Sequence, residues 1–237
     1  MATKKVKITV TKKKVNLKKI IITIVGFLGL IIFAIYIANM PIRNIYITGN
    51  NIVPDKKIIE LSRLSINNTP LIKSYFINIE ENILKEDYIK SVKVKRKKLN
   101  KIYIEVEEYK PIAFYKNELI LSSKKKVNNN YNINYLPYIA NDIDKIYDKF
   151  VTSFTKVNND VLFKISHLEY VPNEVDKERF ILYMIDDNYV YVTLNKITKI
   201  NKYNSIINEL DNKKGIIYLD SGDYIEIKDW HNWVHII

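Results

Sequence analysis

Residues 102–113 read IYIEVEEYKPIA, and this stretch decides the fold of the region around it. Apolar residues occupy every second position up to Val106, which predicts a strand with one buried face and one wet face. Residues 92–96 alternate apolar and basic side chains, and Leu99-Asn100 separates the two segments as a turn. The pattern therefore predicts a β-hairpin whose outward rows are cationic on one strand and acidic on the other.

The sequence before this hairpin has further strand and helix signals. Apolar residues recur near period two at 42–48 and stop at the turn signal Gly49-Asn50-Asn51, which predicts a strand. Pro54-Asp55 is typical of a helix start, and residues 79–86 have helical spacing with two glutamates in the first turn. The predicted order is strand, helix, helix, strand, strand.

The N-terminal part of the chain predicts a membrane anchor. Residues Ile20 to Ile42 contain no charged side chain, and residues 1–19 hold eight lysines and no acid. About 20 apolar residues at ~1.5 Å per residue cross a ~30 Å hydrocarbon core, and lysine-rich flanks stay on the cytoplasmic side. We therefore expect a single span at 20–41, with the leader inside the cell and the bulk of the chain outside.

Two other interpretations of the apolar stretch remain open. A cleaved secretory signal has an apolar region of about 7–15 residues before a small-residue cleavage site. Here the stretch is longer and is followed by Ala38-Asn39-Met40-Pro41, with a bulky Met where a small residue is required. A buried core helix is seldom this long and unbroken. The permanent anchor is the preferred interpretation.

Composition excludes several classes of protein. The formal net charge is +12, but the leader holds eight of the 38 Lys and Arg, which leaves 30 basic residues against 26 acids. The basic cluster from Lys93 to Lys101 is accordingly interpreted as a solvated, partly paired hairpin, although a nucleic-acid patch is the alternative. The chain has no Cys, which excludes disulfides, and its few glycines form no phosphate-binding loop.

The order strand, helix, helix, strand, strand directly after an anchor has a counterpart in a known family. Together with the motif Ile102-x-Ile104-x-Val106-x-Glu108-x-x-Pro111-x-Ala113, it resembles the POTRA domain of the FtsQ/DivIB bacterial cell-division family. Two positions depart from that pattern: Tyr109 stands where Arg is common, and Lys98-Leu99 where Trp-Pro often marks the turn. Neither position has a chemical role, so the resemblance holds.

The region beyond Pro111 is similar to the second, so-called β domain of the same family. An amphipathic helix is predicted from Ile143 to Val157 and another at 200–210. A loop is predicted at 123–134. Strands are predicted at 162–171, 179–185, 189–194, 215–219 and 224–228.

The predicted fold class is α+β, with an N-terminal transmembrane helix, a POTRA domain and a mixed β domain with flanking helices. The expected domain limits are 1–19 for the leader, 20–41 for the anchor, 42–110 for the POTRA domain, 111–228 for the β domain and 229–237 for a short tail.

The exterior offers few groups for catalysis. His167 falls in a predicted strand, where a packed or surface role is expected. His231 and His235 are four residues apart and can share a helical face as metal ligands, but no third ligand or H-E-x-x-H pattern accompanies them. We therefore predict no catalytic, cofactor-binding or metal-binding residues, and no enzymatic activity.

The last predicted strand is the candidate interaction site. A terminal strand is expected at the border of its sheet, where unpaired backbone groups accept a partner strand unless charged residues such as Glu226 and Lys228 blunt it. The resemblance implies that this strand captures a strand from a small bitopic partner of the FtsB/DivIC type. The predicted partner contacts are Tyr224, Ile225, Ile227 and Trp230.

The resemblance implies a scaffold of the division complex, anchored in the cell membrane at the septum with a type II topology, that binds FtsB/DivIC-like and FtsL-like proteins and helps regulate septal wall synthesis. Two alternatives stay open. One is a POTRA-bearing polypeptide translocation or assembly factor, and the other is an anchored cell-wall enzyme.

Overall fold

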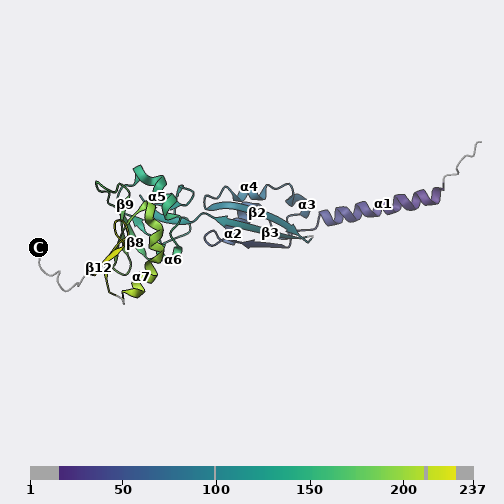
Figure 1. The fold of residues 1–237 in the computed structure, drawn as a ribbon. Helices are drawn as coiled ribbons and strands as arrows, with labels where there is room; N and C mark the ends of the chain where they lie inside the picture. Colours follow the sequence, from purple (N-terminus) through teal and green to yellow (C-terminus); the bar gives the residue numbers. More distant parts are fainter. Residues whose placement is uncertain (1–15, 99, 211–212, 228–237) are drawn as a thin grey trace, which may run out of the picture.

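The computed structural model describes residues 16–98, 100–210 and 213–227 of the 237-residue chain. Figure 1 shows a long helix followed by two domains, each built around its own β-sheet. The first domain has a three-stranded sheet and the second a nine-stranded sheet. The α+β architecture predicted from the sequence is confirmed.

The long helix α1 (Leu17–Ala38) has 22 residues, none of them buried, and is apolar enough to cross a membrane. It begins three residues before the predicted span, because Leu17, Lys18 and Lys19 continue the helix beyond the uncharged stretch. It ends before Pro41, which disfavours helical backbone in the residue ahead of it. The side chain of Asn39 satisfies one terminal carbonyl by donating to Ile35 O at 2.9 Å.

The first domain has the predicted strand, helix, helix, strand, strand order with one extra short helix. Its sheet has the order β1-β3-β2, with β1 parallel and β2 antiparallel to the central strand β3. The extra helix is α3, and α4 ends three residues before the predicted Glu86. The elements are β1 (Asn44–Thr48), α2 (Asp55–Ser62), α3 (Leu71–Ser74), α4 (Ile79–Ile83), β2 (Ile89–Lys97) and β3 (Lys101–Glu108).

The two faces of this sheet differ as the alternation predicts. Ile102 and Ile104 of β3 are fully buried in the core shared with the helices. On the open face, Lys95 Nζ lies 2.8 Å from Glu105 Oε2, and Lys90 Nζ lies 2.7 Å from Glu107 Oε1. The cationic and acidic rows thus pair across the hairpin.

The second domain is a mixed sheet with the strand order β12-β11-β10-β9-β8-β7-β4-β5-β6. Parallel pairing occurs between β4 and β7, β7 and β8, and β10 and β11. Its strands are β4 (Pro111–Tyr115), β5 (Glu118–Leu121), β6 (Lys126–Val127), β7 (Tyr138–Ile139), β8 (Ile165–Tyr170), β9 (Arg179–Met184), β10 (Tyr189–Thr193), β11 (Gly215–Tyr218) and β12 (Tyr224–Ile227). Its helices are η1 (Asp144–Ile146), α5 (Tyr147–Phe154), α6 (Asn159–Leu162), η2 (Leu194–Lys202) and α7 (Tyr203–Glu209).

Helices cover one face of the large sheet and leave much of the other face open. Phe150 and Phe154 of α5 pack against Phe180 of β9, with the ring centroids of Phe150 and Phe180 5.5 Å apart. Both predicted helices of this domain are shorter than expected, because each begins as a 3₁₀-helix. The predicted loop at 123–134 contains the two-residue strand β6.

The two domains touch through Asp87 and Tyr88 and the segments on either side of β6. The Tyr88 hydroxyl donates to Asn128 O at 3.0 Å, and its ring meets that of Tyr131 edge to face at 4.9 Å. Lys125 Nζ lies 2.7 Å from Asp87 Oδ1 across the same junction. Burial raises the pKa of Tyr88 to about 12, so its hydroxyl stays a hydrogen-bond donor at neutral pH.

Candidate interaction site at the edge of the second sheet

The strand β12 lies at one end of the nine-stranded sheet, and within the described residues β11 is its one neighbour. The two strands pair antiparallel, from Tyr224 opposite Tyr218 to Ile227 opposite Gly215. Every residue of β12 is exposed, and Tyr224 is exposed to 52% and Ile227 to 49%. A strand at a sheet border presents backbone N–H and C=O groups on its outer side, so β12 is a template for an added strand.

The pairing of β11 with β12 depends on a glycine. A Cβ atom on Gly215 would lie 2.4 Å from the carbonyl oxygen of Glu226, which is too close for any larger residue without movement of β12. The Gly215 N–H donates to Asn188 Oδ1 at 2.8 Å, which holds the start of β11 against the turn before β10. Gly215 therefore sets how closely the last strand joins the sheet.

Stacked tyrosine rings lead along the open face of the sheet to β12. The ring centroids of Tyr191 and Tyr218 are 5.1 Å apart, and those of Tyr218 and Tyr224 are 4.5 Å apart. The Arg179 guanidinium lies 4.1 Å from the centroid of Tyr191 and begins the stack. Burial, with the Glu226 carboxylate, raises the pKa of Tyr218. The stack gives the edge an aromatic surface on one side.

The other side of β12 borders a groove of about 310 Å³. Its apolar lining includes Ile206 of α7 and Ile225 of β12, and its charged lining includes Lys202 and Glu209. Successive residues of a strand point to opposite faces. A strand added to β12 would thus place alternate side chains over the tyrosines and into the groove.

Comparison with known proteins supports one family. Residues 40–109 match the FtsQ-type POTRA domain. The cell division protein DivIB of Bacillus anthracis is 26% identical over 199 residues, which cover 79% of this chain and 74% of the relative. DivIB of Bacillus subtilis is 27% identical over 187 residues, which cover 76% of this chain and 70% of the relative. The POTRA match and these DivIB relatives support the FtsQ/DivIB family for this chain.

One solved structure is similar to part of the chain. It is the major extracytoplasmic domain of the trans isomer of DivIB from Geobacillus stearothermophilus, with a TM-score of 0.38 and 19% identity. The match covers 44% of this chain and 96% of that domain.

The motif Ile102-x-Ile104-x-Val106-x-Glu108-x-x-Pro111-x-Ala113 has a structural role in this chain. The Glu108 carboxylate accepts the backbone N–H groups of Asn51 and Ile52 at 2.9 Å and of Val53 at 2.8 Å. It thereby ties the loop between β1 and α2 to the end of β3. Pro111 opens β4, and Ala113 is fully buried in that strand. The motif marks the passage from the POTRA sheet to the second sheet.

Three of the four predicted contact residues lie together on β12: Tyr224, Ile225 and Ile227. Trp230 lies outside the described residues, as do Lys228, His231 and His235. That these residues bind a partner stays a prediction. The sequence reasoning missed the neighbours that shape the edge, Tyr191, Tyr218 and Ile206, because they adjoin β12 through strand order and helix packing. The available signal was the pair of alternate tyrosines at 189 and 191, with the separate tyrosine at 218.

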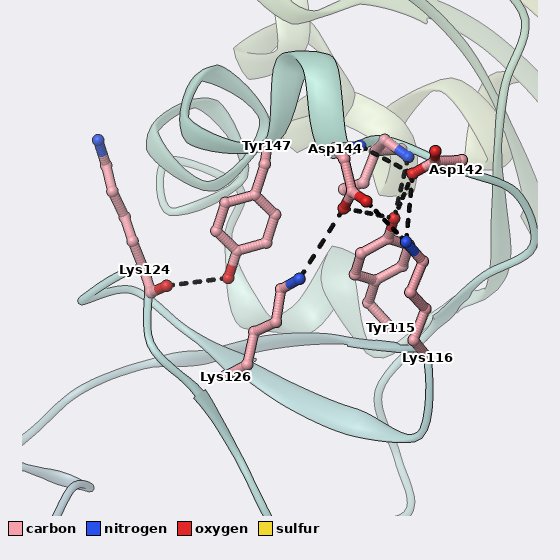
Figure 2. A network of polar contacts seen from close by, with 8 residues as sticks. Tyr115, Lys116, Lys124, Lys126, Asp142, Asp144 and Tyr147 are labelled. Carbon is pink, nitrogen blue, oxygen red and sulfur yellow. Dashed lines mark hydrogen bonds and ion pairs between the residues drawn. The ribbon is translucent and has the colours of Figure 1, made fainter.

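A polar network of titratable side chains lies in the second domain, outside this edge (Figure 2). The Tyr115 hydroxyl lies 2.5 Å from Asp142 Oδ1 and 2.8 Å from Asp144 Oδ1, and Lys116 Nζ lies 2.7 Å from Asp144 Oδ2. The hydrogen bond from Tyr115 lowers the pKa of Asp142 to about 2, and the bond to Asp144 raises that of Lys116. Both charges are therefore paired and stable at neutral pH. The network fastens the β4–β5 hairpin to the segment before α5.

His167 has the structural role expected from its position in a strand. Its ring lies between those of Tyr138 and Tyr183, with centroid distances of 5.0 Å and 3.9 Å. Burial lowers its pKa, and the Glu169 carboxylate partly opposes this. The neutral ring is thus part of an aromatic row across β7, β8 and β9.

Proposed function

We propose that this chain is a non-enzymatic, extracytoplasmic scaffold of the bacterial division complex that binds small bitopic membrane proteins through β12. The relatives it matches are DivIB cell-division proteins, which supports a role in division. The observation that carries the binding proposal is the exposed edge of β12, flanked by stacked tyrosines on one face and a groove on the other. The proposed partners are of the FtsB/DivIC and FtsL types.

The proposal includes the topology and the domain limits. The helix α1 holds the chain in the cell membrane with the leader 1–19 in the cytoplasm, and the POTRA domain (42–110) and β domain (111–228) extend outside at the septum. The lysine-rich leader and the uncharged span support this orientation, because basic flanks are retained on the cytoplasmic side.

The mechanism is tethering combined with strand addition. Anchored proteins share one membrane plane, so weak contacts between them gain from a high effective concentration. The backbone of an added strand supplies affinity at β12. The alternate side chains supply specificity, because one set meets the tyrosines and the other enters the groove.

The test is co-purification from membranes with the full-length chain. The double variant Ile225→Asp/Ile227→Asp places charges on both apolar positions of β12 that the structure describes as exposed. We expect it to lose a small bitopic division protein that the parent chain recovers. The matched control is Val175→Asp, at an exposed valine outside the strands, which should recover the same partners as the parent.

Recovery of the same partners by the double variant would overturn the role of β12. If the parent chain itself recovers no bitopic division protein, the proposed scaffold function is wrong. Far-UV circular dichroism of both variants ensures that a loss reflects the edge rather than unfolding.

A further inference from the structure

The end of the POTRA domain nearest the anchor exposes an unusual set of apolar side chains, which we call the aromatic patch: Ile72, Tyr75 and Phe76. Their exposures are 46%, 61% and 80%. Among the large apolar residues described outside α1, Phe76 is second in exposure to Val175. A cluster of this kind marks a surface that meets a partner or a membrane.

Backbone hydrogen bonds hold this patch beside the C-terminal end of α1. The Leu71 N–H, at the start of α3, donates to Met40 O at 2.8 Å, two residues beyond the helix. The Ile42 N–H donates to Thr69 O at 2.9 Å. Figure 1 shows α3 at the end of the first domain that faces α1.

The length of α1 sets the depth of the patch. Its 22 residues extend about 33 Å, slightly more than a ~30 Å hydrocarbon core. Met40 therefore falls in the headgroup layer when α1 spans a membrane, and α3, bonded to Met40, lies at the same level. Aromatic side chains are favoured at that level.

A second group, which we call the basic rim, lies at the same end: Lys97, Lys98 and Lys101. The Arg43 N–H donates to Asn100 O at 3.0 Å, which places the hairpin end beside the chain leaving α1. Among the described residues the rim lysines have no ion pair, whereas Lys90 and Lys95 farther along β2 are paired. The sequence has no Asp or Glu in residues 41–54, 61–79 or 88–104.

Arg96 connects the patch and the rim. Its guanidinium lies 4.6 Å from the centroid of the Tyr75 ring and donates to Ser74 O at 2.6 Å. The end of β2 therefore holds α3 in place, and the apolar and cationic groups form one surface. A surface with apolar side chains and cations that make no ion pair complements anionic phospholipid headgroups.

We infer that the POTRA domain docks on the anionic phospholipid surface of the membrane that holds its anchor, with the aromatic patch inserted between headgroups and the basic rim facing their phosphates. The inference rests on the proposed insertion of α1 and is independent of partner binding at β12. Docking fixes the tilt of the POTRA domain relative to the bilayer and so the direction in which the second domain extends.

The test uses tryptophan fluorescence of the full-length chain in lipid nanodiscs that contain brominated lipids. Phe76→Trp is introduced after Trp230→Phe and Trp233→Phe remove the native tryptophans. In phosphatidylglycerol discs we expect a blue-shifted emission and quenching roughly twofold or more stronger than for Val175→Trp in the same background. Ile72→Trp is a second reporter in case the first variant misfolds.

The charge contribution is measured by replacing the rim with Lys97→Gln/Lys98→Gln/Lys101→Gln and by changing to phosphatidylcholine discs. Each change should reduce the quenching at position 76. Two results would overturn the inference. One is that position 76 is quenched no more than position 175, as expected if a protein covers the patch. The other is that neutral and anionic discs give equal quenching. Co-elution of the chain with the discs shows α1 inserted, so such a result would leave the anchor and the β12 proposal standing.

Discussion

Glu108 illustrates how one carboxylate can hold a loop that lies far away in the sequence. Its two oxygens accept three consecutive backbone N–H groups, from Asn51 to Val53, which would otherwise lack partners after the turn at Gly49. Gly49 itself has φ +89°, and a Cβ there would lie 2.0 Å from Val106 O. The sequence motif identified Glu108, but its partners more than 50 positions earlier could not be read from spacing.

The variant Glu108→Gln should destabilise the POTRA domain by about 1.5–3 kcal/mol, because an amide group would direct N–H donors at N–H donors. The free energy of unfolding, measured by urea denaturation of the full-length chain, checks this. The control Glu107→Gln breaks an exposed pair with Lys90 and should cost at most about 1 kcal/mol. Equal losses in the two variants would contradict the capping role.

At the scale of elements, the junction between β11 and β12 depends on Gly215. The variant Gly215→Ala should displace β12 and destabilise the second domain by about 1–3 kcal/mol, because the new methyl group meets backbone atoms. Hydrogen exchange of the β11 and β12 amides, read by mass spectrometry, should accelerate. Gly222→Ala is the control, since its Cβ would meet the movable ring of Tyr224. Unchanged exchange in Gly215→Ala would show that the sheet adapts without loss.

The aromatic row on β7, β8 and β9 makes stability depend on pH. Burial lowers the pKa of His167 in the folded chain, so the unfolded chain, with a pKa near ~6.5, binds a proton first as the pH falls. The contribution of the neutral ring is therefore complete above about pH 6.5 and is lost below it. The groups that face the ring are Tyr138, Tyr183 and Glu169.

Replacing the titrating ring tests this dependence. The variant His167→Phe keeps a ring in the stack and should lose less stability than the parent chain between about pH 6.5 and pH 5. Urea denaturation at a series of pH values gives the difference in the free energy of unfolding between the two chains. The other titrating groups contribute equally to both chains and drop out of this difference. Parallel curves for the two chains would contradict the prediction.

Two strands that the sequence predicted well flank the turn Asp186-Asp187-Asn188. The strands predicted at 179–185 and 189–194 are observed as β9 (Arg179–Met184) and β10 (Tyr189–Thr193). The helix α3 was missed because four residues are too few for a periodic signal. The predicted helix from Ile143 to Val157 is interrupted because backbone hydrogen bonding there begins as 3₁₀, which side-chain spacing does not reveal. The strand predicted at 224–228 is observed as β12 (Tyr224–Ile227), at the border of the described sheet.

At the scale of the molecule, the junction through Tyr88 sets how firmly the two sheets are held together. The variant Tyr131→Ala/Lys125→Glu removes the ring contact and reverses the charge opposite Asp87. We expect a broader distribution of distances between the domains. The chain has no Cys, so dyes on Asn68→Cys and Val175→Cys allow single-molecule energy transfer in the full-length protein.

Tyr135→Ala is the control for this prediction, because the Tyr135 ring packs on Phe163 within the second domain. It should leave the distance distribution unchanged. An equally narrow distribution in the double variant would show that the short connection at Tyr109 and Lys110 is sufficient to hold the domains.

The tyrosine stack that ends at β12 should also give the molecule an optical signal. The rings of Tyr191 and Tyr218 are inclined by 5°, and those of Tyr218 and Tyr224 by 15°. Rings held in fixed, asymmetric surroundings give near-ultraviolet circular dichroism, which is lost when packing loosens. A strand that settles on the edge would alter the surroundings of Tyr224, so occupancy can be followed without any attached label.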